Sequence, residues 1–195
     1  GAVLNTAQVP AGGQMAVVGL GGVGMNALMG GVVAGAERIV AVDLSPEKLR
    51  LARELGATDT FLAGNADVVA EIKEATAGGL DYVIETAGSV PAMNLAYGIA
   101  ARGGMVVSAG LPAATAQFSY LHAQMVTDEK SIRGSYMGSC VPKRDIPRFL
   151  ALYRRGKLPV QKLRSGFIRL EDINEGFDKL SDGAVLRQIL QPHAA

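Results

Sequence analysis

The sequence predicts a doubly wound α/β domain built on a parallel sheet, and three observations support this fold class. First, Gly19-x-Gly21-x-x-Gly24 follows a short apolar run and opens a helix-like segment. Second, another apolar run ends in Asp43, at about the 20-residue spacing typical of a carboxylate that binds an adenosine ribose. Third, strand-like and helix-like segments alternate four times before about residue 109, as expected when strands run parallel.

Each glycine of this motif has a separate structural reason. Gly19 permits a tight strand-to-helix turn, Gly21 lets a pyrophosphate approach the backbone, and Gly24 lets the helix pack closely on the strand. The free N–H groups at the start of that helix then offer an anion site. A generic tight turn is the alternative, but the strand, helix and Asp43 in register favour a dinucleotide site. Because a carboxylate repels a 2′-phosphate, Asp43 favours NAD over NADP.

Composition narrows the class of protein further. The 195 residues are 49% hydrophobic and 19% charged, with a net charge of +1, which disfavours nucleic-acid and membrane-surface partners. Apolar runs stay short of the ~18 residues of a membrane span, and no secretory signal is visible. Cys140 is the only cysteine, which favours a reducing, cytoplasmic location, and one Cys with two His cannot build a usual tetrahedral zinc site.

The expected elements follow from apolar periodicity and from Gly and Pro positions. Residues 1–9 resemble the end of a helix, and Ser45 with Pro46 predicts the start of another. A tail with its own strand, helix and strand does not continue the alternation. Strands are expected at 15–18, 38–43, 59–62, 81–85, 105–109, 131–136, 166–170 and 186–190, and helices at 22–34, 46–55, 67–77, 91–101, 143–155 and 172–180.

Several motifs together carry a family resemblance across nearly the whole chain. They are Gly19-Leu-Gly-Gly-Val-Gly24, Asp43 with Lys48, Leu55-Gly-Ala-Thr58, Asp81-Tyr-Val-Ile-Glu-Thr-Ala-Gly88, Gly103-Gly104 and Leu170-Glu-Asp-Ile-Asn-Glu-Gly-Phe177. In combination they resemble the zinc-dependent alcohol dehydrogenases of the medium-chain dehydrogenase/reductase superfamily.

The resemblance implies a particular domain organisation. Residues 1–140 would form a NAD-binding Rossmann domain with a six-stranded sheet, and residues 141–195 would return to a GroES-like catalytic domain. In the family, the ligands of the catalytic zinc precede the position that matches Gly1. The chain therefore resembles the coenzyme half alone, with no catalytic residue and no zinc ligand, and we expect it to bind NAD weakly and to be inactive by itself.

The resemblance also assigns contacts to the coenzyme. Backbone groups of the glycine-rich turn would face the pyrophosphate, Asp43 and Lys48 the adenosine ribose, and Arg187 the pyrophosphate through its bidentate guanidinium. The other implied contacts lie after the fourth, fifth and sixth strands. The full set is Gly19, Gly21, Gly22, Val23, Gly24, Asp43, Lys48, Thr86, Ala87, Ala109, Gly110, Leu111, Met137 and Arg187.

Each side-chain assignment has a structural alternative. Lys48 would suit a solvated helix face, and Arg187 would suit an ion pair with Asp182. Thr86 and Ala109 are small residues at strand ends, where sheets often need them.

The remaining thiol and imidazole groups have structural interpretations. Cys140 is expected to be a structural thiol, since nothing suggests a His base beside it. His122 is expected in a loop near the subunit interface, and His193 in solvent.

The function implied by the resemblance is NAD-dependent oxidation of an alcohol, or reduction of an aldehyde. A polyol dehydrogenase and a non-catalytic NAD-binding module remain alternatives. Zinc-free quinone or enoyl reductases usually use NADPH, which Asp43-Leu44 disfavours, and the tail disfavours a methyltransferase. The resemblance also implies pairing of coenzyme domains through a sheet edge near residues 120–136, and so a homodimer or homotetramer. We also expect partial exposure of apolar tail residues, namely Phe167, Ile168, Leu170 and Phe177.

Overall fold

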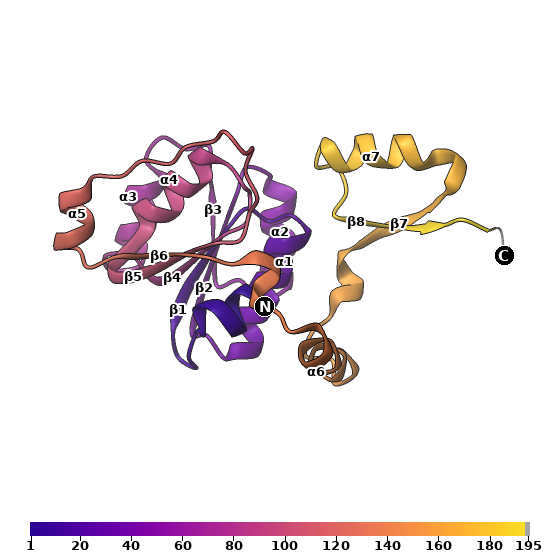
Figure 1. Ribbon diagram of the computed structural model, residues 1–195, viewed down its shortest axis with the longest axis horizontal. Coiled ribbons are helices and arrows are strands. Elements are labelled where there is room, and N and C mark those ends of the chain that lie inside the picture. Colours follow the sequence, from indigo (N-terminus) through magenta and orange to yellow (C-terminus); the bar gives the residue numbers. More distant parts are fainter. Residues whose placement is uncertain (194–195) are drawn as a thin grey trace.

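Six parallel strands form the main sheet of the computed structural model, which describes residues 1–193 (Figure 1). Their order is β3-β2-β1-β4-β5-β6, and every pairing between neighbours is parallel. The order reverses between β1 and β4, where a crevice opens at the carboxyl ends of the strands. This confirms the doubly wound fold. The strands are β1 (Gln14–Val18), β2 (Arg38–Asp43), β3 (Asp59–Leu62), β4 (Leu80–Glu85), β5 (Ala100–Ser108) and β6 (Ser131–Gly134).

Helices cover both faces of the sheet because the strands are apolar on both sides. On one face, α1 (Gly22–Ala34) and α2 (Pro46–Glu54) pack with Met15 and Val17 of β1. On the other face, α3 (Val68–Ala75) and α4 (Val90–Ile99) pack with Ala16 and Val18. Successive side chains of β1 thus pack alternately into two separate apolar cores, and the central strands have no polar face.

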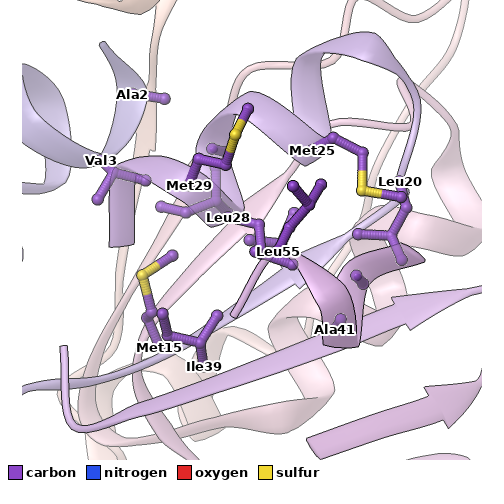
Figure 2. Packing of buried hydrophobic residues seen from close by; sticks show 14 of the residues in the cluster. Ala2, Val3, Met15, Leu20, Met25, Leu28, Met29, Ile39, Ala41 and Leu55 are labelled. Atoms are coloured by element: carbon purple, nitrogen blue, oxygen red, sulfur yellow. The ribbon is translucent and has the colours of Figure 1, made fainter. Parts of the chain in front are cut away.

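Two glycines let α1 lie close to its neighbours. A Cβ on Gly30 would lie 3.4 Å from Val3, and one on Gly31 only 2.5 Å from the sulfur of Met15. Val3 belongs to η1 (Ala2–Ala7), a short π-helical turn that matches the helix end expected over residues 1–9. Figure 2 shows Val3, Met15, Leu28 and Met29 among the buried side chains of this core. The buried core on this face therefore extends from the sheet through α1 to the first residues of the chain.

The predicted start of α2 is confirmed in detail. The Ser45 hydroxyl accepts a hydrogen bond from the Lys48 N–H at 3.3 Å, and Pro46 occupies the first helical position. This cap fixes the direction in which α2 leaves the end of β2, directly beside Asp43.

Several boundaries differ from the expectation, among them those around His122, β5 and β6. His122 does not lie in a loop but begins α5 (His122–Thr127), a short helix with no buried residue and therefore no apolar stripe to reveal it. Strand β5 begins at Ala100 rather than 105, because Ala100 already pairs with Leu80 before an irregularity shifts the register. Strand β6 ends at Gly134, short of the expected residue 136.

The tail forms a second, smaller unit beside the main sheet (Figure 1). Its two strands pair in parallel with each other, and α7 forms the crossover between them. Its elements are α6 (Pro142–Arg154), η3 (Val160–Leu163), β7 (Arg164–Arg169), η4 (Leu170–Asp172), α7 (Ile173–Ser181) and β8 (Arg187–Gln191).

Apolar contacts hold the start of this unit and the approach to β8 against the main domain. Leu163 is buried in the core that α1 and α2 share, and Leu158 and Leu186 pack against it half-buried. Between these contacts, Phe167, Leu170 and Phe177 are 50–63% exposed and Ile168 is half-buried, as the sequence predicted. None of the helices within residues 1–193 is both long enough and apolar enough to span a membrane.

Candidate functional site

The turn from β1 into α1 requires glycine at its first and last motif positions. Gly19 has a φ of +91°, which side chains rarely adopt, and a Cβ on it would lie 2.8 Å from the Cβ of Ala87. A Cβ on Gly24 would collide with the carbonyl oxygen of Gly19. Gly21 instead faces open space, with no atom within 4 Å of its Cβ position. The turn is therefore closed towards the protein and open where a ligand would approach the first N–H groups of α1.

Thr86, directly after β4, braces this turn. Its hydroxyl lies 2.5 Å from the carbonyl oxygen of Gly19 and 3.2 Å from that of Val18, and it donates to these acceptors. The hydroxyl thus links the ends of β1 and β4 across the switch point of the sheet. The contact with a ribose expected of Thr86 stays a prediction.

A cavity of about 600 Å³ opens beyond the ends of β1 and β2. Asp43 forms part of its wall and is held in place by two backbone donors: the N–H of Leu20 lies 2.6 Å from Oδ2, and that of Ser45 lies 2.9 Å from Oδ1. Since a carboxylate offers about four lone-pair sites, each oxygen keeps capacity for a ligand hydroxyl. The cavity brings together four predicted residues, namely Gly19, Asp43, Lys48 and Ala87.

Lys48 is half-buried and does not lie on a freely solvated helix face. Its Nζ lies 3.3 Å from the Cβ position of Gly183, which belongs to the tail. Asp182, Gly183 and Ala184 complete the wall of the same cavity. The cavity is therefore closed jointly by the main domain and the C-terminal unit.

A second cavity, of about 320 Å³, lies at the N-terminus of α1. One side is formed by the helix start and the other by the chain that follows β6. Met137 stands in this wall with its side chain 72% exposed. The predicted residues that line the cavity are Gly22, Val23, Ala109, Met137 and Arg187.

Arg187 brings a cation to this helix start from the opposite end of the chain. Its Nη2 lies 3.0 Å from the Cβ position of Gly22. Within residues 1–193, Arg187 forms no ion pair with Asp182 or with any other carboxylate. A guanidinium beside the positive end of a helix dipole is unfavourable unless an anion lies between them. This arrangement therefore favours an anionic group bound at the first N–H groups of α1.

The predicted residues after β5 lie against the loop that follows β4. Gly88 has a φ of +68°, and a Cβ on it would lie 2.9 Å from the backbone nitrogen of Leu111. A Cβ on Gly110 would collide with the backbone nitrogen of Gly88. Leu111 itself is 85% exposed, so its side chain is free to meet a ligand or a neighbouring domain. The loops after β4 and β5 thus pack backbone against backbone, and a side chain at either glycine would separate them.

Glu85 holds both of these loops and was not among the predicted residues. Its buried carboxylate accepts hydrogen bonds from the Gly88 N–H at 2.6 Å and from the Ser108 hydroxyl at 3.2 Å. Its carbonyl oxygen accepts from the N–H groups of Ala109 at 2.8 Å and Gly110 at 3.1 Å. The sequence could have pointed to Glu85, because it is a carboxylate at the end of an apolar strand, as Asp43 is.

Cys140 and the two histidines lie apart from the two cavities. Burial, followed by a hydrogen bond with Asp145, raises the pKa of the Cys140 thiol, which makes it a poor nucleophile. His122 and His193 are exposed. In the part of the chain that the structure describes, no three His, Cys, Asp or Glu side chains come together as a metal site.

The fold and the two cavities at the ends of the strands define a nucleotide-binding α/β domain. A sequence profile of the zinc-binding dehydrogenases matches residues 22–155, and the chain therefore belongs to that family.

Known relatives agree with this assignment. Alcohol dehydrogenase 1 of Zea mays is 34% identical over 98% of this chain and 51% of its own length. Alcohol dehydrogenase class-3 of Myxine glutinosa is 37% identical with the same coverage. The crystal structure of an alcohol dehydrogenase zinc-binding domain protein from Burkholderia ambifaria superposes with a TM-score of 0.93 at 36% identity, covering 98% of this chain and 52% of that one. The chain spans about half the length of the curated relatives it matches.

Proposed function

We propose that this chain is the coenzyme-binding part of an NAD-dependent alcohol dehydrogenase, which transfers hydride between an alcohol or aldehyde and the nicotinamide. The observation that carries the proposal is the arrangement at the switch point of the sheet. Asp43 and Arg187 lie on either side of the open Gly21 turn, each in the wall of one cavity. A ribose diol and a pyrophosphate are the groups that such a carboxylate and such a cation bind.

The proposed contacts follow the order of the two cavities. The adenosine half lies in the cavity of Asp43, Lys48 and Ala87, and the N–H groups of Gly22 and Val23 with Arg187 hold the pyrophosphate. The second mononucleotide then extends towards the ends of β4, β5 and β6, because the two halves of a doubly wound sheet bind one mononucleotide each. There it meets Thr86, Ala109, Gly110, Leu111 and Met137.

NAD is favoured over NADP because the carboxylate of Asp43, held by two backbone N–H groups, lines this cavity. A 2′-phosphate at this position would face a carboxylate. The same observation disfavours the zinc-free, NADPH-dependent reductases of the superfamily. A polyol dehydrogenase shares all of these features and stays the alternative.

Hydride transfer is assigned to the complete enzyme and not to this chain alone. Among the described residues, no three His, Cys, Asp or Glu side chains lie together as zinc ligands. We therefore assign neither a zinc ligand nor a catalytic residue to this chain. We expect residues 1–140 to act as the NAD-binding domain, residues 141–195 to belong to the catalytic domain, and the isolated chain to bind coenzyme without turnover.

The proposed assembly is a homodimer or homotetramer in the cytoplasm. The sheet ends at β6, an edge strand, and the chain on either side of it exposes Leu121, Val126 and Tyr136. An unpaired edge beside exposed apolar side chains suits pairing with a second copy. Sedimentation equilibrium tests this: a purely monomeric complete enzyme would contradict it.

Titration with NADH and NADPH, followed by calorimetry, tests the coenzyme assignment. We expect the wild-type chain to bind NADH at least about tenfold more tightly than NADPH. Asp43→Ala removes the carboxylate that contacts the ribose of NADH and that repels the 2′-phosphate of NADPH. It is expected to lower the affinity for NADH by about tenfold and to raise the affinity for NADPH.

The gain in NADPH affinity is the informative result, because a misfolded variant cannot produce it. Equal binding of both coenzymes by the wild-type chain would contradict the NAD preference. Binding of neither coenzyme would overturn the proposed function.

A further inference from the structure

Three successive residues after β6 adopt the left-handed backbone conformation. The φ angles of Met137, Gly138 and Ser139 are +49°, +66° and +49°. Residues with a side chain rarely adopt this conformation, and two of these three carry one. Such a segment persists only where its surroundings hold it in place.

The surroundings that hold it come from the first residues of the chain. Thr6 in η1 is buried, and its Oγ1 lies 2.7 Å from the Oγ of Ser135 and 2.8 Å from the Oγ of Ser139. One hydroxyl thus joins Ser135, which precedes the left-handed turn, to Ser139, its last residue. Next to it, Asn5 Nδ2 donates a hydrogen bond to the carbonyl oxygen of Gly138 at 3.2 Å.

The other side of the same turn faces the second cavity. Ser135, Met137 and Gly138 line that cavity opposite the N-terminus of α1. They follow β6, on the opposite side of the switch point from Asp43, and therefore lie in the half of the crevice away from the adenosine. A ligand group in contact with Met137 thus meets a wall whose shape is set by Thr6 from behind.

We infer that Thr6 is a positioning residue for the coenzyme's second mononucleotide: its hydroxyl holds the Met137–Ser139 turn in the conformation that receives the nicotinamide end. This inference rests on the proposed function. Thr6 does not touch the cavity itself, and its effect runs through Ser135 and Ser139. The role belongs to an η1 residue that no sequence motif marks.

A purely structural role makes a different prediction. If Thr6 only stabilised η1, its loss would lower stability without distinguishing between the two ends of the coenzyme. If it positions the turn, its loss weakens binding of NADH but leaves binding of AMP unchanged, because AMP occupies only the adenosine half.

Thr6→Val removes the hydroxyl at nearly constant volume, and Thr6→Ser retains it. We expect Thr6→Val to weaken NADH binding roughly five- to tenfold, since the loss of about one hydrogen bond at each serine loosens the turn. Thr6→Ser should bind NADH as the wild-type chain does. Ser139→Ala, at an exposed position that endangers folding little, should weaken NADH binding by a smaller factor.

Thr76→Val is the matched control. Thr76 is equally buried, and its hydroxyl donates to the carbonyl oxygen of Ile72 at 2.6 Å, at the end of α3 and away from both cavities. Its loss should lower stability and leave NADH affinity unchanged. Each variant is titrated with NADH, by nicotinamide fluorescence, and with AMP, by calorimetry.

The outcomes separate the inference from the proposed function. Binding of AMP and NADH by Thr6→Val with wild-type affinities, or an equal loss for both ligands, overturns the positioning role and leaves the proposed function intact. A wild-type chain that binds AMP as tightly as NADH also overturns it, because the turn then contributes nothing. A wild-type chain that binds neither overturns the proposed function, and this inference with it.

Discussion

Glu85 connects two loops that are far apart in sequence through four hydrogen bonds, two to its carboxylate and two to its carbonyl oxygen. Glu85 is buried, so its carboxylate relies on these protein donors and not on solvent. The backbone near Gly88 and Gly110 is therefore held by the acceptor groups of one residue, Glu85.

Replacement of Glu85 tests this dependence. Glu85→Leu leaves the Gly88 N–H without its partner and is expected to lower the free energy of unfolding by about 1–3 kcal/mol. Glu85→Gln keeps one oxygen for Gly88 and offers an N–H to Ser108, so its loss should be clearly smaller. Urea unfolding followed by circular dichroism measures both. An equal loss in the two variants would show that the donors need the negative charge rather than an oxygen acceptor.

At the scale of the elements, one ion pair ties β2 to the edge strand β3. Arg38 Nε and Nη2 donate to the two carboxylate oxygens of Asp59 at 2.9 and 3.0 Å, a bidentate pair with both side chains about a quarter exposed. The Arg38 guanidinium lowers the pKa of Asp59 below its ordinary value, while burial opposes this shift.

The lowered pKa gives this pair a defined pH dependence. Its stabilisation is fully present above the unfolded-state pKa of about 4 and is lost as the pH falls through the lower pKa of the folded state. Arg38→Met is expected to cost about 1 kcal/mol of unfolding free energy near neutral pH, and the difference from wild type should shrink below about pH 4.

The exposed pair of Arg50 and Glu54, 3.3 Å apart, supplies the control for this measurement. Its side chains are 75% and 52% exposed, so Arg50→Met should change stability by less than about 0.5 kcal/mol at any pH. A difference between wild type and Arg38→Met that stays constant down to about pH 3 would contradict the role assigned to Asp59.

Elements with strong local signals could be predicted from the sequence. The first helix and β2 have the expected bounds because glycines and apolar runs mark them, and β3 has the expected bounds although its signal in the sequence is weak. Helix α5 was missed because it buries nothing and so carries no periodic pattern. The longer β5 was missed because its first residue pairs across an irregularity that only the three-dimensional register reveals.

The residues of the candidate site likewise divide into those that local sequence predicts and those that it does not. The glycine-rich turn and Asp43 have a local spacing that predicts their meeting. Arg187 could be linked to that turn only through family resemblance, since contacts between distant segments leave no trace in spacing. Thr6 had neither signal: its serine partners lie more than a hundred residues away in sequence.

For the whole molecule, Arg187 links the C-terminal unit to the start of α1. Its position beside Gly22 places a tail residue in the wall of a cavity that otherwise belongs to the main domain. Tail residues 182–184 contribute to the other cavity in the same way. Bound coenzyme would therefore stabilise the docking of the two units as well as each unit alone.

Arg187→Gln tests this link. With no carboxylate partner among residues 1–193, the guanidinium contributes little to stability alone, but its loss is expected to weaken NADH binding by at least about tenfold and to reduce the salt dependence of binding. Arg169→Gln, in β7 and paired only with Glu171, should leave NADH affinity unchanged. A comparable loss in both variants would point to general charge attraction instead of a contact at the helix start.

The C-terminal unit also has an exposed apolar face. Phe167, Leu170 and Phe177 stay open to solvent in this chain, which spans about half the length of its relatives. Their exposure fits the proposal that residues 141–195 pack against a catalytic domain.

The contact of Arg187 with Gly22 also bears on the order in which the molecule forms. β1, α1 and β2 follow one another in sequence, so the glycine-rich turn and Asp43 assemble through short-range contacts that close quickly. The Arg187 contact closes a loop containing most of the chain, and such closure is slow and costs more entropy. We therefore expect the anion site to be completed last during refolding, so that recovery of coenzyme binding lags behind recovery of secondary structure.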